Sequence, residues 1–173
     1  MRLSFRLISV CVLAALLSAL SAFAQQRSSI ETRGDVQKPR SWTVEEVKNQ
    51  FSGEIRTAKS TFGPEKRERT STGIPLISLL RAADLKMEET PKHYDLSFIV
   101  IVEAYDGYRA YFSFAELAVG EKENPVLLIW EENGKPIPDN ETPFRLRVDS
   151  SRSIFGITRI TLVDGIKLAD GLK

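Results

Sequence analysis

Cysteine and histidine are nearly absent from this chain. Its 173 residues include one cysteine, Cys11, and one histidine, His93. Cys11 lies in an apolar N-terminal stretch, so the rest of the chain can form no disulfide and offers no thiolate as nucleophile or metal ligand. His93 stands in a polar connector without a second histidine, which excludes the common zinc sites and predicts a surface residue. An exported protein without cysteine suits an oxidising compartment.

The chain also lacks an excess of either charge. It has 24 basic and 23 acidic residues. Removal of the N-terminal segment takes away Arg2 and Arg6, which leaves 22 basic against 23 acidic residues and a net charge of −1. No basic face stands out, so nucleic acid is not expected as a partner.

Long apolar runs are absent except near the N-terminus. Arg2 and Arg6 precede an apolar run over 7–20, and residues 22–24 read Ala-Phe-Ala. This pattern is typical of a Sec-type signal peptide over 1–24 with cleavage after Ala24, and predicts a periplasmic or secreted protein. An uncleaved anchor is the alternative, although the run is short for a span, and no later segment could cross a membrane.

Residues 25–40 are polar and aperiodic, which predicts a flexible leader, and residues 41–173 then form a single domain. Thr43 and Glu46 have the spacing of a capping box and predict a helix over 42–51. A second helix, over 72–85, is indicated by an apolar stripe at i, i+3, i+4 and i+7: Leu76, Leu79, Leu80 and Ala83.

The remaining segments with a regular pattern predict mainly β-strands. The strongest strand covers 96–105, and Asp106-Gly107 predicts a tight turn into a second strand over 108–112. Ser113 and Glu116 then predict a capped helical turn. Further strands are expected at 54–60, 126–130, 144–148 and 157–163, the third of these with Arg145 and Arg147 facing outward. Strands interrupted irregularly by two or three short helices favour an α+β fold with β-rich mixed sheets.

Four segments together resemble one family, the molybdopterin-binding domain of the sulfite-oxidase type, and more closely its short, exported, single-domain members. They read WTVEEVKNQF (42–51), TGIPLISLLRAADL (72–85), VEAYDGYRAYFSFAEL (102–117) and LLIWEENGKPIPDNETPFRLRV (127–148), the last followed by SRSIFGITRITL (151–162). The resemblance implies a mixed, β-rich fold of that type with a groove for a pterin cofactor.

In catalytic members, a cysteine ahead of the second of these segments binds molybdenum. The corresponding stretch, 60–71, reads STFGPEKRERTS and has no cysteine. Within it, residues 65–69 are almost wholly charged and predict a solvated loop. A soft metal centre needs an ionised sulfur ligand. We therefore expect no cofactor and no oxygen-atom transfer, with molybdopterin as a possibility from the resemblance alone.

The resemblance places Arg152 and Ser153 toward the cofactor, and Arg145 lies close to them in sequence. These three residues are candidates for an anion site, because guanidinium groups bind phosphate well. Ordinary outward strand charge is the alternative. Asp106 and Tyr108 are further candidates for the groove, although the hairpin turn itself explains them.

Three functions remain open from the sequence. The leading hypothesis is a non-catalytic accessory module that binds an unknown small ligand or a periplasmic protein. The second is an oxidoreductase that anchors a pterin and molybdenum without cysteine. The third is a structural protein-interaction domain with no small-molecule site.

Overall fold

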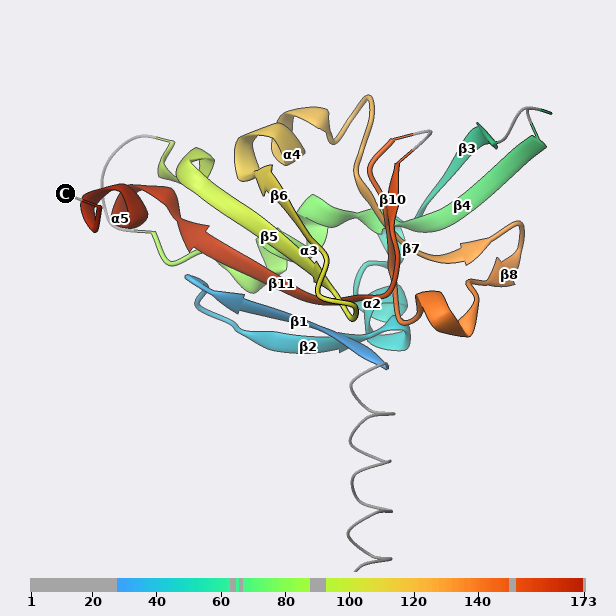
Figure 1. Ribbon diagram of the computed structural model, residues 1–173, viewed down its shortest axis with the longest axis horizontal. Helices are drawn as coiled ribbons and strands as arrows, with labels where there is room; N and C mark the ends of the chain where they lie inside the picture. Colours follow the sequence, from blue (N-terminus) through green and yellow to red (C-terminus); the bar gives the residue numbers. More distant parts are fainter. Residues whose placement is uncertain (1–27, 63–64, 66, 88–92, 150–151, 173) are drawn as a thin grey trace, which may run out of the picture.

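The computed structural model describes residues 28–62, 65, 67–87, 93–149 and 152–172, so the predicted signal peptide lies outside the described residues. These residues form an α+β fold of two β-sheets and four short α-helices, as predicted (Figure 1). None of the helices in the described ranges has the length and apolarity needed to cross a membrane.

The first sheet has five strands in the order β2-β1-β11-β5-β6. Its strands are β1 (Ser29–Gly34), β2 (Arg40–Thr43), β5 (Phe98–Ala104), β6 (Arg109–Ser113) and β11 (Ile157–Asp164). β1 runs parallel to β11, and the other neighbours are antiparallel. The Asp106-Gly107 hairpin between β5 and β6 is confirmed.

The flexible leader predicted over 25–40 is wrong where the structure describes it, because β1 and the start of β2 belong to this sheet. Ile30 and Thr32 are completely buried, whereas Glu31 and Arg33 face outward. The Trp42 indole nitrogen donates to the hydroxyl of Thr32 at 3.2 Å. Only one residue of β1 is large and apolar, so its alternation was too weak to distinguish a strand from a polar linker.

The second sheet has six strands, ordered β10-β9-β7-β4-β3, with β8 paired to β7. Its strands are β3 (Arg56–Phe62), β4 (Arg67–Pro75), β7 (Leu127–Glu132), β8 (Lys135–Pro136), β9 (Arg145–Arg147) and β10 (Ser153–Ile154). The solvated loop predicted over 65–69 is wrong in part, since β4 begins at Arg67. Residues 67–69 pair with 60–62 in a solvent-facing hairpin, where strand residues can be charged.

Both predicted helices are confirmed. α2 (Val44–Gln50) begins with the complete capping box of Thr43 and Glu46. α3 (Leu76–Ala83) begins later than predicted, because the preceding residues through Pro75 finish β4. The predicted helical turn is α4 (Phe114–Gly120), capped by Ser113. The sequence did not predict α5 (Gly165–Asp170) or the 3-10 helices η1 (Ser52–Glu54), η2 (Tyr94–Ser97) and η3 (Asp139–Glu141).

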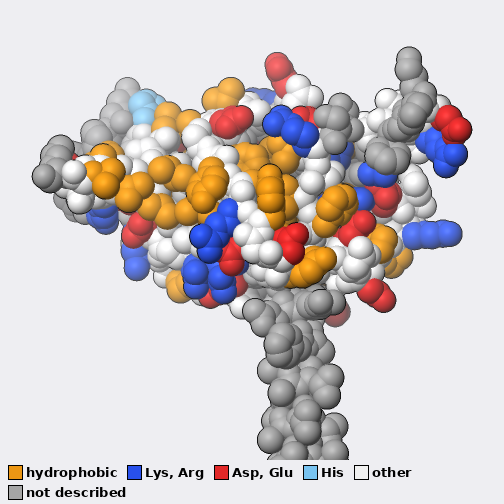
Figure 2. Space-filling model, viewed as in Figure 1, with side chains coloured by type: hydrophobic (Ala, Val, Ile, Leu, Met, Phe, Trp, Pro, Cys, Tyr) orange, Lys and Arg blue, Asp and Glu red, His pale blue; other side chains and the backbone are white. Residues whose placement is uncertain are grey.

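The main core lies between the two sheets, with α3 inside it. Val100 and Ile160 come from the five-stranded sheet, Leu79 from α3, and Leu128 and Leu146 from the six-stranded sheet, and all five are completely buried. Figure 2 views the opposite, outer face of the five-stranded sheet, where acidic and basic side chains lie beside hydrophobic ones. Burial of so much apolar surface stabilises the two sheets as one unit.

Candidate anion-binding site

The register of the six-stranded sheet brings polar side chains from several strands onto one face. Ser71 lies opposite Glu132, and Arg147 lies opposite Ser153. Residues opposed in an antiparallel pair share a face. The pairing shifts between Thr72 and Gly73, so β7 advances three residues where β4 advances two. This bulge turns Glu132 to the face that carries the arginines of β9.

These side chains line a cavity of about 140 Å³, which we call the arginine cleft. Its lining residues are Ser60, Arg69, Ser71, Ile129, Glu132, Arg145, Arg147, Asp149, Ser153 and Phe155. The core packs against the other face of the sheet, through residues such as Leu128 and Leu146. The cleft is therefore a polar hollow in the outward face of the sheet.

Arg145 was predicted to face solvent, and that prediction is wrong, because only 3% of its surface is exposed. Its face was predicted correctly, since it lies opposite the core, but the cleft encloses it. Nη2 lies 2.6 Å from Glu132 Oε1, and Nη1 lies 3.0 Å from Glu141 Oε2. A buried guanidinium needs such compensation, since an unpaired charge in a low-dielectric interior is very costly.

Glu132 is shared by two arginines. Its Oε1 also lies 2.8 Å from Nε of Arg69, which approaches from β4. Glu132 and Glu141 thus hold Arg69 and Arg145 in fixed positions along the cleft. Guanidinium groups held in this way need little ordering when a ligand binds.

Two buried polar atoms of the cleft have no hydrogen-bond partner among the described residues: Ser71 Oγ and Arg145 Nε. Ser71 is 1% exposed, and Arg145 Nε is the one guanidinium nitrogen that neither carboxylate engages. An unmet buried donor costs about 1–3 kcal/mol. Both atoms are well placed to donate to an acceptor that enters the cleft.

Arg147 differs from its neighbours because its side chain makes no ion pair or hydrogen bond with any described residue, although the residue is partly buried. Desolvation lowers the pKa of its guanidinium, and the negative charge of Asp149 opposes that shift. Asp149 itself binds Arg152, with 2.6 Å between Oδ2 and Nε. Arg147 therefore leaves one positive charge in the cleft available to a ligand.

Four of the five sequence-predicted site residues line two adjacent cavities. Arg145 and Ser153 line the arginine cleft. Arg152 is not among its lining residues, and its side chain is 74% exposed. Asp106 and Tyr108 lie in the β5–β6 turn and line a neighbouring cavity, which also includes Ser153. Sequence reasoning missed Ser71, Glu132 and Arg147 as site residues, since only the strand register brings them together.

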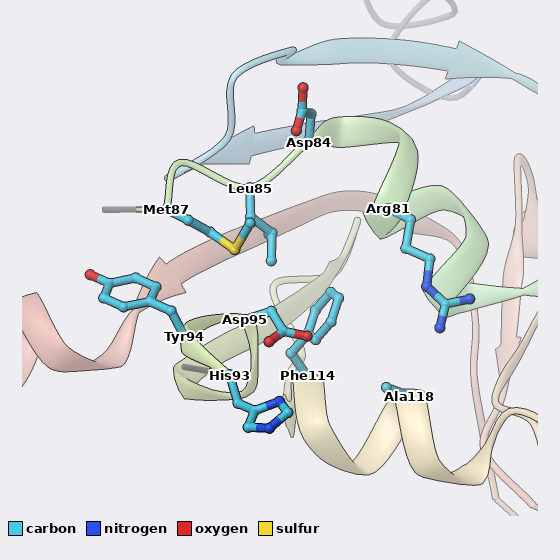
Figure 3. A pocket seen from close by; sticks show the side chains of 9 residues that line it. All are labelled: Arg81, Asp84, Leu85, Met87, His93, Tyr94, Asp95, Phe114 and Ala118. Atoms are coloured by element: carbon cyan, nitrogen blue, oxygen red, sulfur yellow. The ribbon is translucent and has the colours of Figure 1, made fainter. Parts of the chain in front are cut away.

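A larger cavity of about 490 Å³ lies between α3, α4 and η2 (Figure 3). Leu85 and Met87 line it from the segment after α3, opposite Phe114, and His93 lies exposed at its rim, as predicted. Its one arginine, Arg81, pairs with Glu121 at 2.9 Å, and the carboxylates of Asp84 and Asp95 also line it. This cavity therefore offers weaker recognition of an anion than the arginine cleft does.

The residues of the arginine cleft do not fit a molybdenum centre. Within the stretch 60–71, where the resemblance expects the metal ligand, residues 60–62 pair with 67–69 in β3 and β4, and Ser60, Arg69 and Ser71 line the cleft. Hydroxyl and guanidinium groups do not replace a thiolate for a soft metal. The described part of the chain also contains no cluster of three His, Cys, Asp or Glu residues suited to a metal. The donors fit an anion instead.

No protein-family model matches this chain, and no curated protein matches it. The resemblance to the sulfite-oxidase type stays a prediction from the sequence.

Proposed function

We propose that this protein is a non-catalytic binding module that takes a small anionic ligand in the arginine cleft. The observation that carries the proposal is Arg147, a partly desolvated guanidinium with no ion pair among the described residues. Arg145 Nε and Ser71 Oγ add two buried groups without partners. An anion here would neutralise a charge and satisfy buried donors at the same time.

The dimensions favour a compact group. The cleft measures about 140 Å³, whereas cavities that enclose a whole drug-sized ligand span roughly 300–1,000 Å³. A phosphate, sulfate or carboxylate group suits the smaller volume. Guanidinium groups bind such anions through paired N–H donors, which fixes orientation as well as charge.

The arrangement also supports a relationship to the molybdopterin-binding domain of the sulfite-oxidase type. The resemblance assigns two distant segments to the cofactor groove, 60–71 and the region around Ser153. Ser60, Ser71 and Ser153 all line the arginine cleft. We propose an exported relative that keeps the anion-binding part of such a groove without the cysteine ligand.

The acidic groups in and beside the cleft are engaged in ion pairs, which favours binding without catalysis. Glu132 is held by Arg69 and Arg145, and Glu141 by Arg145. A carboxylate whose oxygen is already engaged by guanidinium groups is poorly placed to take a proton from a substrate. The third acid, Asp149, binds the side chain of Arg152.

The test is a calorimetric titration of the full mature protein, purified without refolding, with inorganic phosphate and with sulfate. We expect Arg147→Gln to weaken binding about ten- to hundredfold, the value of one charge-assisted hydrogen bond of roughly 1.5–3 kcal/mol. Arg109→Gln is the matched control, since Arg109 is an exposed strand arginine bound to Glu103 on the other sheet. Equal effects of the two substitutions, or no binding by the parent protein, would contradict the proposal.

Metal and pterin analysis of protein from its native compartment tests the non-catalytic part. Molybdenum and pterin at a near-equal ratio to protein, with substrate-dependent redox turnover, would restore the oxidoreductase hypothesis. Their absence together with phosphate binding would support an anion-binding module.

A further inference from the structure

A second cavity, of about 380 Å³, lies beside the arginine cleft, at the end of the β5–β6 hairpin. We call it the aromatic cleft, and its lining residues are Ala104, Tyr105, Asp106, Tyr108, Asn140, Glu141, Ser153, Ile154 and Phe155. Three of its aromatic residues have exposed surface: Tyr105 at 50%, Tyr108 at 58% and Phe155 at 47%. Large aromatic side chains gathered in one exposed hollow are a mark of a binding site.

Local geometry holds the aromatic cleft in shape. Gly156 has a φ of +59°, and a Cβ there would lie 2.3 Å from Cδ1 of Tyr105, so the tyrosine ring packs directly on the glycine. The backbone N–H of Tyr105 donates to the Gly156 carbonyl at 3.0 Å, and the Gly156 N–H donates to the Glu141 carbonyl at 3.0 Å. The Asp106 carboxylate accepts from the Tyr108 N–H at 3.0 Å. A preformed cleft of this kind loses little conformational entropy when it binds a ligand.

The chemistry of the lining matches a sugar ring. Aromatic faces carry a partial negative charge and pack favourably against the polarised C–H groups of a pyranose. The Asn140 amide and the carboxylates of Asp106 and Glu141 supply hydrogen-bonding groups at the same hollow. Such a mixture of apolar faces and a few convergent polar groups is typical of small-molecule sites.

The aromatic and arginine clefts adjoin. Ser153 and Phe155 line both of them, and the guanidinium carbon of Arg145 lies 5.6 Å from the centre of the Phe155 ring. A ligand with its ring in the aromatic cleft therefore has the cationic groups of the arginine cleft within reach. The charge offered by Arg147 complements an anionic substituent on that ring.

We propose that the ligand is an acidic saccharide, a pyranose ring that bears a phosphate or carboxylate group. Its ring lies against Tyr108 and Phe155, and its anionic group enters the arginine cleft beside Arg147. This inference rests on the proposed function for the anionic group, and it adds that the ligand also carries a sugar ring.

The experiment compares four probes by calorimetry with the full mature protein: glucose 6-phosphate, inorganic phosphate, glucose and adenosine 5′-monophosphate. We expect glucose 6-phosphate to bind at least tenfold more tightly than phosphate. Tyr108→Ala and Tyr108→Leu should each remove that gain and leave phosphate affinity within twofold of the parent. Tyr111→Ala is the control, because Tyr111 is 64% exposed on β6 and outside both clefts.

The outcomes separate the two proposals. Phosphate binding that depends on Arg147, with no gain from the sugar and no effect of either Tyr108 variant, would overturn the saccharide and leave the anion site standing. Tighter binding of the adenosine monophosphate than of the sugar phosphate would overturn the saccharide in favour of a planar ring. Binding of neither phosphate nor sugar phosphate would overturn both proposals.

Discussion

The outward faces of the two sheets use the same charged residue types in different ways. On the five-stranded sheet, Arg159 lies between Glu31 and Glu103, at 3.1 and 2.9 Å, and Arg109 binds the other oxygen of Glu103 at 2.8 Å. Each charge in this group has a partner from an adjacent strand. The group is accessible to water, and the Arg159 side chain is 30% exposed. The two arginines and two glutamates of this group are paired without a ligand.

The arginine cleft of the six-stranded sheet is incomplete by comparison. Arg145 is only 3% exposed and is held by two carboxylates, yet its Nε has no partner. Arg147 on the same strand makes no ion pair with the described residues. The difference teaches that charge composition does not identify a site. Burial together with an unmatched charge does identify one. At such a place neither water nor the protein compensates the charge fully, and an incoming anion can do so.

The largest effect should come from removing the buried charge of the cleft. Arg145→Met leaves Glu132 and Glu141 without the guanidinium that both bind. We expect the free energy of unfolding to fall by about 3–5 kcal/mol, the range for one lost partner of a buried ion pair. Urea denaturation followed by circular dichroism measures the change.

A combined variant shows whether the loss comes from a carboxylate left without its partner. Arg145→Met with Glu141→Gln removes the charge that loses its ion pair, while Glu132 keeps Arg69, so it should recover part of the stability. If the free energy of unfolding of Arg145→Met fell by less than about 1 kcal/mol, Arg145 would contribute no more to stability than an exposed surface arginine does.

The next effect tests the buried charge of the five-stranded sheet. Asp164 is completely buried at the end of β11 and accepts a hydrogen bond from the Tyr94 hydroxyl. Burial acts to raise the pKa of Asp164, but the bonds from Tyr94 and from the N–H groups of Lys167 and Ile166 outweigh it, and the pKa is lowered. Tyr94→Phe should cost about 1–3 kcal/mol at neutral pH.

The pH dependence follows from the sign of that shift. A carboxyl with a lowered folded-state pKa stabilises the fold above its unfolded value of 3.8, and this contribution is lost as the pH falls through the folded-state pKa. Tyr94→Phe should therefore shrink the stability difference between pH 7 and pH 3. Urea midpoints of both proteins at the two pH values measure it, and an unchanged difference would contradict the role of the hydroxyl.

The features that the sequence predicted well are local. The capping box of Thr43 and Glu46 and the turn at Asp106-Gly107 need only a few adjacent residues, so tertiary contacts did not alter them. β1 was missed because it carries one large apolar residue and because one of its two partners, β11, lies more than a hundred residues away in the chain. Part of the hydrogen bonding that makes this polar segment a strand therefore comes from a distant strand.

The candidate site was predictable only in part for the same reason. Ser153 was a candidate from the resemblance and Arg145 from its place among nearby arginines in the sequence, and both line the cleft. The burial of Arg145 depends on Glu132, which reaches that face through the bulge between β4 and β7. A one-residue change in register would turn Glu132 away, and no local pattern reports such a register.

A smaller effect should follow from cutting the exposed network. Arg159→Met leaves Glu31 and Glu103 in contact with water and keeps Arg109 on Glu103. We expect a loss of about 0.2–1 kcal/mol in urea denaturation at low salt, with a smaller loss at 1 M sodium chloride because exposed pairs are screened. A loss as large as that of Arg145→Met would remove the contrast between the two faces.

The smallest effect on stability should come from Arg147, and it is the sharpest test of the cleft. Arg147→Gln removes a desolvated cation that no described residue pairs with, so the free energy of unfolding should stay within about 0.5 kcal/mol of the parent, or rise. Phosphate in excess should raise the melting temperature of the parent, because a ligand that binds only the folded state stabilises it. The same phosphate should leave Arg147→Gln unchanged, while Arg159→Met responds like the parent. A phosphate-induced rise in melting temperature that persists in Arg147→Gln would place the anion elsewhere and would remove the proposed difference between the two faces.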